Sequence, residues 1–303
     1  MQNSNQLFWI LIGLCAATMF ALISPFSIYT EQAGLLPVYS VFYRYIVIII
    51  VATPIMLLFF RQYFKFNRQQ YWLIILYACA NAVLSITYLA SFSFIPLSLA
   101  VIIFFTQPLI TLMVVPFIFG DRLTTAKIIV FLMAFIGLIF VVGPEFSNLN
   151  GIGILLALIA AITAVIQLLC LSKLVKELNP VVLLYSGHFI AMFITVFIIV
   201  TLVYTGNLPP PVAITKAIIW PFAGLLGCYI LAQTLFINVA KRLKPATISF
   251  ISNIEPIVTV ALAIWLFNES LSNVQAIGVV IVLTSLMIGS MFKENQQNEQ
   301  PAE

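Results

Sequence analysis

The sequence predicts an all-α membrane protein of ten transmembrane helices, arranged as two inverted repeats of five helices each. Three observations predict this fold: an apolar composition, an uneven distribution of basic residues, and an internal repeat. Of the 303 residues, 63% are hydrophobic and only 7% are charged, whereas soluble domains carry about 25% charged residues. Crossing a bilayer as a helix takes about 20 apolar residues, and the long apolar runs here favour helices over a β-barrel.

The apolar runs are separated by short loops. Pro37 and Pro180 suit the first turns of helices, and residues 207–211 (NLPPP) form the clearest loop. The amino terminus lacks the basic segment of a signal peptide, so we expect the first span to be retained. The predicted spans are 7–29, 37–60, 71–93, 97–119, 126–143, 151–172, 180–204, 216–239, 246–267 and 273–292.

The basic residues indicate how the spans are oriented. If the amino terminus is cytoplasmic, 11 of the 13 Lys and Arg residues lie in cytoplasmic loops or the tail, which are Arg61, Lys65, Arg68, Arg122, Lys127, Lys173, Lys176, Lys241, Arg242, Lys244 and Lys293. The outer loops hold only Lys216, and Arg44 lies within the second span. This agrees with the positive-inside rule. Both termini are therefore expected in the cytoplasm, with a disordered tail at 293–303.

An internal repeat relates the two halves. Shifting the chain by 148 residues aligns QPLITLMVVPFIFGDRL with EPIVTVALAIWLFNESL without a gap, and it pairs Pro108 with Pro256 and Thr111 with Thr259. The same shift pairs Asp121 with Glu269. Because each repeat has five spans, the second must enter the membrane from the opposite side. Inverted repeats are typical of secondary transporters, which open a midplane site alternately to either face.

These motifs also resemble a known family, the EamA branch of the drug/metabolite transporter superfamily, over about residues 7–292. The resemblance rests on a proline followed by a helix that ends in an acidic residue, and on the later Gly137 and Gly278. It implies repeats at 1–148 and 149–292 and a bacterial inner-membrane carrier, commonly an exporter of amino acids or other small metabolites. It also implies a cavity lined by spans 1, 3, 4, 6, 8 and 9. Asp121 departs from the glutamate that is common there.

Glu255 is the first candidate site residue, because it lies near the middle of the ninth span. A charge at that depth costs about 2.5 to 3.5 kcal/mol on insertion scales, so the side chain should face a cavity or a partner, or be protonated. Ser252 and Thr259 share its face of the helix. We expect Glu255 to bind a substrate amine or a proton; the alternative is a structural clamp between helices.

Gln107 occupies the matching position in the fourth span, with Thr111 one turn later. A carboxyl in one half and a neutral amide in the other would suit an amino acid or another zwitterion. The alternative is that Gln107 bonds backbone carbonyls left free near Pro108.

Spans 3 and 8 each carry polar and aromatic side chains on one helical face. The shift of 148 pairs Asn81 with Tyr229, Ser85 with Gln233, and Tyr88 with Phe236. We expect this face to line the cavity, where rings and hydrogen-bonding groups would hold a ligand with an apolar body. Ordinary helix packing is the alternative.

Two further ionisable residues lie within spans at nearly matching depths, Arg44 in the second and His188 in the seventh. We expect Arg44 to reach the outer interface or to pair with Glu31 or Glu145. His188 is a second candidate for proton coupling, or it is simply hydrogen-bonded. Weaker lining candidates are Thr18, Ser24, Pro25, Thr163 and Gln167.

The cysteines and the charge distribution limit which cofactors and partners are expected. Cys15, Cys79, Cys170 and Cys228 lie inside apolar runs with no CxxC pair, so neither disulfides nor a metal site are expected. We expect no cofactor and no nucleic acid. The expected partners are a small-molecule substrate, membrane lipid and, as a candidate coupling ion, the proton; the choice between monomer and homodimer stays open.

The alternative functions are efflux of drugs or other organic solutes and antiport of nucleotide sugars. A nucleotide sugar carries several negative charges, and the few basic residues inside the predicted spans do not favour such a ligand. A channel and a membrane enzyme are less favoured. Selectivity rings and filter loops are not evident. The single histidine and the lack of catalytic motifs argue against an enzyme.

Overall fold

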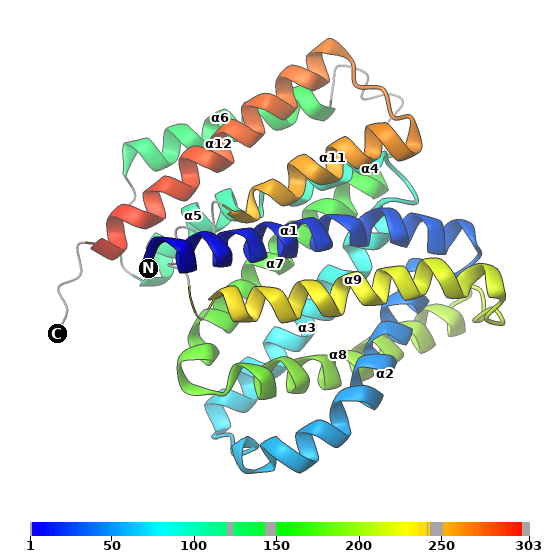
Figure 1. Ribbon diagram of the computed structural model, residues 1–303. Helices are drawn as coiled ribbons and strands as arrows, with labels where there is room; N and C mark the ends of the chain where they lie inside the picture. Colours follow the sequence, from blue (N-terminus) through cyan, green and yellow to red (C-terminus); the bar gives the residue numbers. More distant parts are fainter. Residues whose placement is uncertain (1, 120–123, 143–149, 241, 243–250, 299–303) are drawn as a thin grey trace.

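The structure is a computed structural model that describes residues 2–119, 124–142, 150–240, 242 and 251–298. The regular elements of these residues are helices (Figure 1): α1 Gln2–Gln32, α2 Pro37–Ile55 with a π-helical turn Met56–Phe60 and a 3₁₀ turn Arg61–Tyr63, α3 Arg68–Ser91, α4 Leu97–Phe104, α5 Gln107–Phe119, α6 Thr125–Val142, α7 Gly151–Glu177, α8 Pro180–Tyr204, α9 Lys216–Ala240, α11 Ile254–Phe267 and α12 Asn273–Asn298. Asp121, Glu145 and the predicted repeat boundary at 148 lie outside the described residues.

The chain is a multi-pass integral membrane protein. Within the described residues, six helices are long and apolar enough to cross a bilayer, namely α1, α2, α3, α7, α8 and α9. Shorter apolar helical segments cover 97–111, 128–141, 254–267 and 273–288. Large apolar side chains such as Leu58, Phe197 and Trp265 point outward, where lipid would surround them. The start of α1 and the end of α12 lie on the same side of the bundle (Figure 1).

The fourth predicted span, 97–119, is not one continuous helix, so this part of the prediction was wrong. The chain turns at Phe105 and Thr106 between α4 and α5. Pro108 has no N–H to give to the carbonyl of Phe104, so the ladder of helical hydrogen bonds is interrupted here. The Thr106 backbone N–H and hydroxyl both donate to the Ile103 carbonyl, at 3.1 and 2.7 Å.

The second repeat has its turn at the equivalent place. Ile251 and Ser252 are helical, Asn253 is a turn residue, and α11 begins at Ile254, two residues before Pro256. The shift of 148 that aligns the two prolines therefore also aligns the two turns, to within a residue. At the other end of the repeat, α12 extends to Asn298, beyond its predicted end at 292 and into the segment expected to be a disordered tail.

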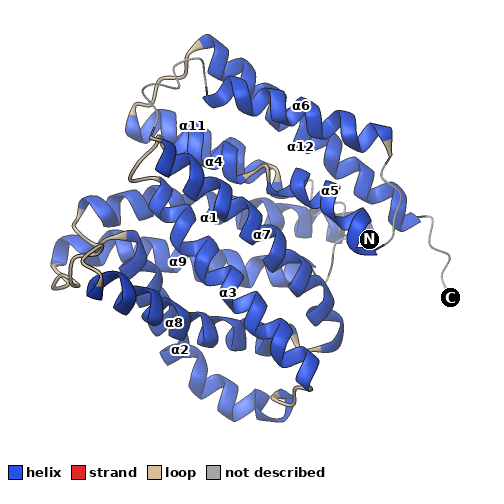
Figure 2. Ribbon diagram, turned by 180° about the vertical axis from the view of Figure 1, so that it is seen from behind, coloured by secondary structure: helices blue, strands red, loops and turns tan. Residues whose placement is uncertain are grey.

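The helix contacts repeat when the two halves are exchanged (Figures 1 and 2). α3 packs on α7 as α1 packs on α9, and α1 packs on α11 as α7 packs on α4. Three further contacts join a helix to its own counterpart: α2 with α8, α4 with α11, and α6 with α12. This pattern is the one expected of two repeats related by an approximate two-fold axis.

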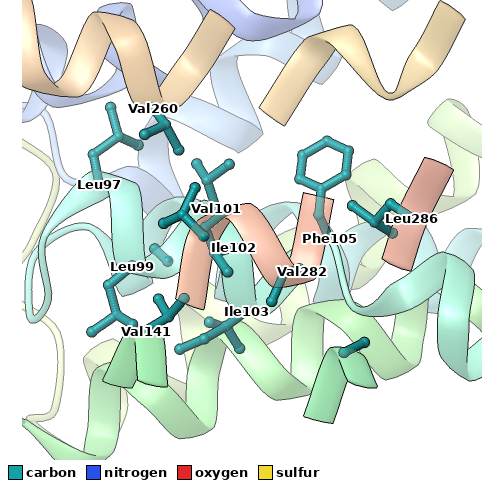
Figure 3. Packing of buried hydrophobic residues seen from close by; sticks show 14 of the residues in the cluster. Leu97, Leu99, Val101, Ile102, Ile103, Phe105, Val141, Val260, Val282 and Leu286 are labelled. Atoms are coloured by element: carbon teal, nitrogen blue, oxygen red, sulfur yellow. The ribbon is translucent and has the colours of Figure 1, made fainter. Parts of the chain in front are cut away.

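α4 lies at the centre of the largest hydrophobic cluster. Its residues Leu97 to Ile103 are almost fully buried, and they pack among side chains of α6, α11 and α12, including Val141, Val260, Val282 and Leu286 (Figure 3). The α6–α12 contact itself depends on glycine. A Cβ on Gly278 would lie 2.7 Å from the Gly137 carbonyl oxygen and 2.6 Å from the Val141 nitrogen. Small residues thus let the two backbones touch, as is common between membrane helices.

Candidate functional site

Two buried polar clusters lie between the repeats, and α3 contributes to both. The Arg44 cluster consists of Arg44, Tyr45, Asn81, Ser85, Gln167, His188 and Tyr229, and the Glu255 cluster consists of Ser24, Tyr88, Phe104 and Glu255. Asn81 and Ser85 belong to the first cluster, and Tyr88, three residues after Ser85, belongs to the second. The predicted polar face of span 3 is therefore directed into the protein.

Arg44 is the centre of the first cluster and is only 3% exposed. Its Nη2 donates to Ser85 Oγ at 3.0 Å. Its guanidinium carbon lies 4.2 Å from the centroid of the Tyr229 ring, a cation–π distance. Its Nε is buried and has no hydrogen-bond partner. Arg44 of α2 thus joins α3 of the first repeat to α9 of the second.

A chain of hydrogen bonds continues from α2 through α3 to α7. The Tyr45 hydroxyl lies 3.3 Å from Ser85 Oγ and accepts from Asn81 Nδ2 at 3.2 Å. Asn81 Oδ1 accepts from Gln167 Nε2 at 3.0 Å. Gln167, a weaker candidate from the sequence, is thus held against Asn81, and this side of the cluster is made of neutral groups only.

His188 closes the cluster on the side of α8. Its Nδ1 lies 2.7 Å from the Leu184 carbonyl, which can only accept, so Nδ1 carries a hydrogen. In the neutral ring, Nε2 then accepts from the Tyr229 hydroxyl at 2.6 Å. Both ring nitrogens have hydrogen-bond partners, as expected if His188 has a structural role and not one in proton coupling.

The prediction that Arg44 reaches the interface or pairs with Glu31 was wrong. The Glu31 carboxylate accepts a hydrogen bond from Ser93 instead, and Glu145 lies outside the described residues. Arg44 lies on the face of α2 that packs against α3 and α8, so its side chain points into the bundle. The matching depths of Arg44 and His188 could have indicated this inward direction, because the two residues lie on counterpart helices, α2 and α8, that pack against each other.

Glu255 follows directly after the break in the second repeat, in the first turn of α11. A negative charge is stabilised at a helix amino terminus. Tyr88 lies within electrostatic range of its carboxyl group. The Tyr88 hydroxyl is 3.4 Å from Ser24 Oγ, and its ring centroid is 4.3 Å from that of Phe104. The ring nearest in these interactions, Tyr88, and its neighbour Phe104 both belong to the first repeat.

The threonines of the repeated motif serve the backbone in both halves. Thr259 Oγ1 donates to the Glu255 carbonyl at 2.9 Å, and Thr111 Oγ1 donates to the Gln107 carbonyl at 2.9 Å. Gln107 Nε2 lies 3.4 Å from Thr111 Oγ1, so its amide is not directed at the carbonyls before Pro108, as the structural alternative proposed. Ser252 lies before the turn, on the other side of it from Glu255.

The remaining candidates lie around these clusters. Gln233 is one turn after Tyr229 and interacts with its side chain. Thr18 and Thr163 donate to carbonyls of their own helices, at 2.9 and 2.7 Å. Pro25 lies inside α1, which continues without a break.

The acidic residue that ends the repeated motif has a structural partner in the other repeat. Glu269 accepts from the backbone N–H groups of Leu97 and Ser98, at 2.6 and 3.0 Å, and from Ser98 Oγ at 2.6 Å. It therefore caps the amino terminus of α4. Its side chain borders a cavity of about 310 Å³ at that end of the bundle. Asp121, the counterpart of Glu269, is outside the described residues.

Inverted repeats with helix breaks beside buried polar groups are typical of one class of protein, the secondary transporters. Two segments of the chain, 7–143 and 151–291, each match the EamA-like transporter family. The chain therefore belongs to the EamA-like transporter family, and the resemblance noted in the sequence is confirmed.

The chain is also similar in fold to a solved structure described only as the crystal structure of a protein. The alignment covers 95% of this chain and 98% of the other, with a TM-score of 0.63 and 14% sequence identity. At this identity the likeness concerns the fold. The search of curated proteins returned no match.

Proposed function

We propose that the protein is a secondary transporter that exports small metabolites, amino acids or related compounds, from a bacterial cell by alternating access. The observation that carries the proposal is the pair of helix breaks at equivalent places, with Glu255 at one of them. Ten spans and two cytoplasmic termini in the inner membrane are part of the same proposal, and the distribution of basic residues supports them.

The proposed substrate site lies between the repeats, where both polar clusters meet α3. Rocking of one repeat against the other would open it to either side. The residues proposed to contact the substrate are Asn81, Ser85, Tyr88, Gln107, Thr111, Tyr229, Gln233, Ser252, Glu255 and Thr259. Four of them, Asn81, Tyr88, Tyr229 and Glu255, interact with a side chain of the opposite repeat, which is where alternating access would move side chains.

Glu255 is proposed to receive either the substrate amine or a coupling proton. The neutral Tyr88 lies within electrostatic range of its carboxyl group. A carboxylate in that environment is stabilised by a bound cation or by protonation. His188 is a second coupling candidate, because protonation of its ring would reverse its hydrogen bond with Tyr229.

Proteoliposomes containing the full-length protein would test this function. We expect uptake of at least one compound from a panel of amino acids and related metabolites, faster with an imposed pH gradient than without it. Glu255→Gln should abolish the effect of the gradient, whereas Glu31→Gln, a carboxyl change away from the breaks, should keep it. Normal transport and unchanged pH dependence in Glu255→Gln would contradict the role of Glu255.

A carrier of aromatic organic cations, as in drug efflux, is the second candidate. The rings around Tyr88 favour it, since Phe104 and Phe92 lie 4.3 and 4.9 Å from Tyr88 by centroid. Adding such cations to the panel separates the two candidates. Conductance in a planar bilayer would point to a channel instead, and turnover in detergent to an enzyme.

A further inference from the structure

Arg44 is a buried cation without a counter-ion among the residues that the structure describes. Its contacts are a hydroxyl, Ser85, and the rings of Tyr45 and Tyr229. One donor, Nε, has no partner at all. An arginine inside a membrane is costly, and the two cation–π contacts and the single hydrogen bond supply no opposite charge to offset that cost. The cluster therefore leaves a positive charge incompletely compensated.

The groups that face Arg44 from each neighbouring helix are neutral. α3 presents Asn81 and Ser85, α8 presents His188, and α9 presents Tyr229. His188 uses both ring nitrogens as a neutral imidazole does, so it adds no negative charge and accepts no proton from Arg44. An anion would supply what the cluster lacks.

From these contacts we propose that Arg44 is the binding position for a carboxylate group of the transported solute. The proposal rests on the function proposed above and specifies one end of its substrate. Nε and Nη2 form one edge of the guanidinium, and this edge can donate two parallel hydrogen bonds to a carboxylate. Nη2 donates to Ser85 and Nε is unpaired, so a carboxylate would replace a single bond to a neutral hydroxyl with two bonds to a charged acceptor.

The position of Arg44 suits alternating access. Arg44 joins Ser85 of the first repeat to Tyr229 of the second, so a rocking motion that separates α3 from α9 must loosen one of these contacts. A bound carboxylate would stabilise the arginine while that happens. Arg44 would then bind the substrate at the contact between α3 and α9, which has to open during transport.

The charge of Arg44 also limits the class of solute. A single guanidinium matches one carboxylate, and the side chains around it, Ser85 and Tyr229, carry no further positive charge. The class of substrate is therefore a small monocarboxylic acid, amino acids included, and a single arginine does not suit a multiply charged phosphate.

Matched pairs of probes would test the proposal without requiring transport. The thermal stability of the purified full-length protein in nanodiscs is measured against each of the twenty L-amino acids and against the corresponding carboxamide, which keeps the amine and removes the carboxylate. We expect at least one acid to bind at least tenfold more tightly than its amide. If no acid is preferred over its amide, the proposal is overturned, as it is if inorganic phosphate competes as well as the acid.

Arg44→Gln should bind the acid and the amide equally. It should also raise the melting temperature of the ligand-free protein, because it removes a buried charge, whereas a purely structural role for Arg44 predicts a lower one. If Arg44→Gln does not fold, Arg44→Lys keeps the charge but loses the two-donor edge, and it should reduce the preference for the acid severalfold. Thr195→Val is the control outside the cluster, because the buried Thr195 hydroxyl donates to the Ala191 carbonyl of its own helix, and it should retain the preference.

Transport assays separate this proposal from the one on which it rests. If the wild type moves no compound of the panel, the proposed function fails. If the wild type transports amides as fast as acids, or if Arg44→Gln keeps a preference for acids, the function stands and the assignment of Arg44 fails.

Discussion

The two broken spans share a backbone design and differ in chemistry. Both have a turn before a proline, and in both a threonine donates to a carbonyl four residues earlier at 2.9 Å. In the first repeat the side chain at the break is the neutral Gln107, and in the second it is the acidic Glu255. In the function proposed above, the shared features would serve a motion that both halves make. The difference would then bind the ligand or proton asymmetrically.

The largest expected effect comes from separating the repeats where counterpart helices touch. Gly278→Leu would place a side chain against the Gly137 carbonyl and the Val141 backbone, which cannot move aside. We expect a loss of about 3 kcal/mol or more in stability, at the upper end for overpacked sites. Thermal unfolding of the purified protein measures it. Gly227→Ala is the control, since a Cβ there meets nothing within 4 Å, and equal stability of both variants would contradict the interpretation.

The second prediction removes the chemical difference between the halves. Glu255→Gln makes the second break resemble the first, and it should slow gradient-driven transport at least tenfold. A hydrogen bond to a charged group contributes about 1.5 to 3 kcal/mol, which corresponds to a factor of ten or more. The activity that remains should not depend on pH, whereas the wild type should. Proteoliposome uptake at several pH values measures both, and a variant as fast as the wild type would refute the asymmetry.

The third prediction concerns the cap that crosses from one repeat to the other. Glu269→Gln keeps the size of the side chain but weakens its bonds to the N–H groups of Leu97 and Ser98. We expect a loss of about 1 kcal/mol in stability, as for other helix caps. Glu31→Gln serves as the control because its partner, Ser93, is a side chain and not a helix terminus. Equal melting temperatures for the two variants would argue against a capping role.

The smallest expected effect tests whether the shared backbone design is equivalent in both halves. Thr111→Val and Thr259→Val each remove one hydroxyl-to-carbonyl bond of the same length. Each should cost about 0.5 to 1.5 kcal/mol, the net value of one hydrogen bond. Denaturation of the two variants side by side compares them. A larger loss for Thr259→Val than for Thr111→Val would mean that Thr259 has a further partner, such as the substrate, because Thr111 already accepts from Gln107 Nε2 at 3.4 Å.

Hydropathy predicted nearly all the helix positions, because long apolar runs leave little choice of structure. It missed the turn at Phe105 and Thr106, since proline alone does not indicate a break in a membrane helix. Pro25 and Pro221 lie inside helices that continue through them. Hydropathy likewise did not predict the second turn, which the structure shows at Asn253, directly before α11.

The site was predicted less completely than the fold. The periodicity of Asn81, Ser85 and Tyr88 identified a face that does point inward, although contact with a substrate stays a prediction. Arg44 was assigned to the interface because its depth allowed it to snorkel, and only the packing of α2 on α8 shows that it faces inward. The bond from Glu269 to Ser98 joins residues 171 positions apart, and no local pattern encodes it.

The Glu269 cap also has a consequence for biosynthesis. The ribosome synthesises the first repeat completely before Glu269. When α4 is inserted, the backbone N–H groups of Leu97 and Ser98 therefore lack their native acceptor. Contacts between residues so distant in the chain form late in folding. The first half therefore cannot reach its final structure on its own, and maturation of the protein is completed only when the last two helices have been inserted.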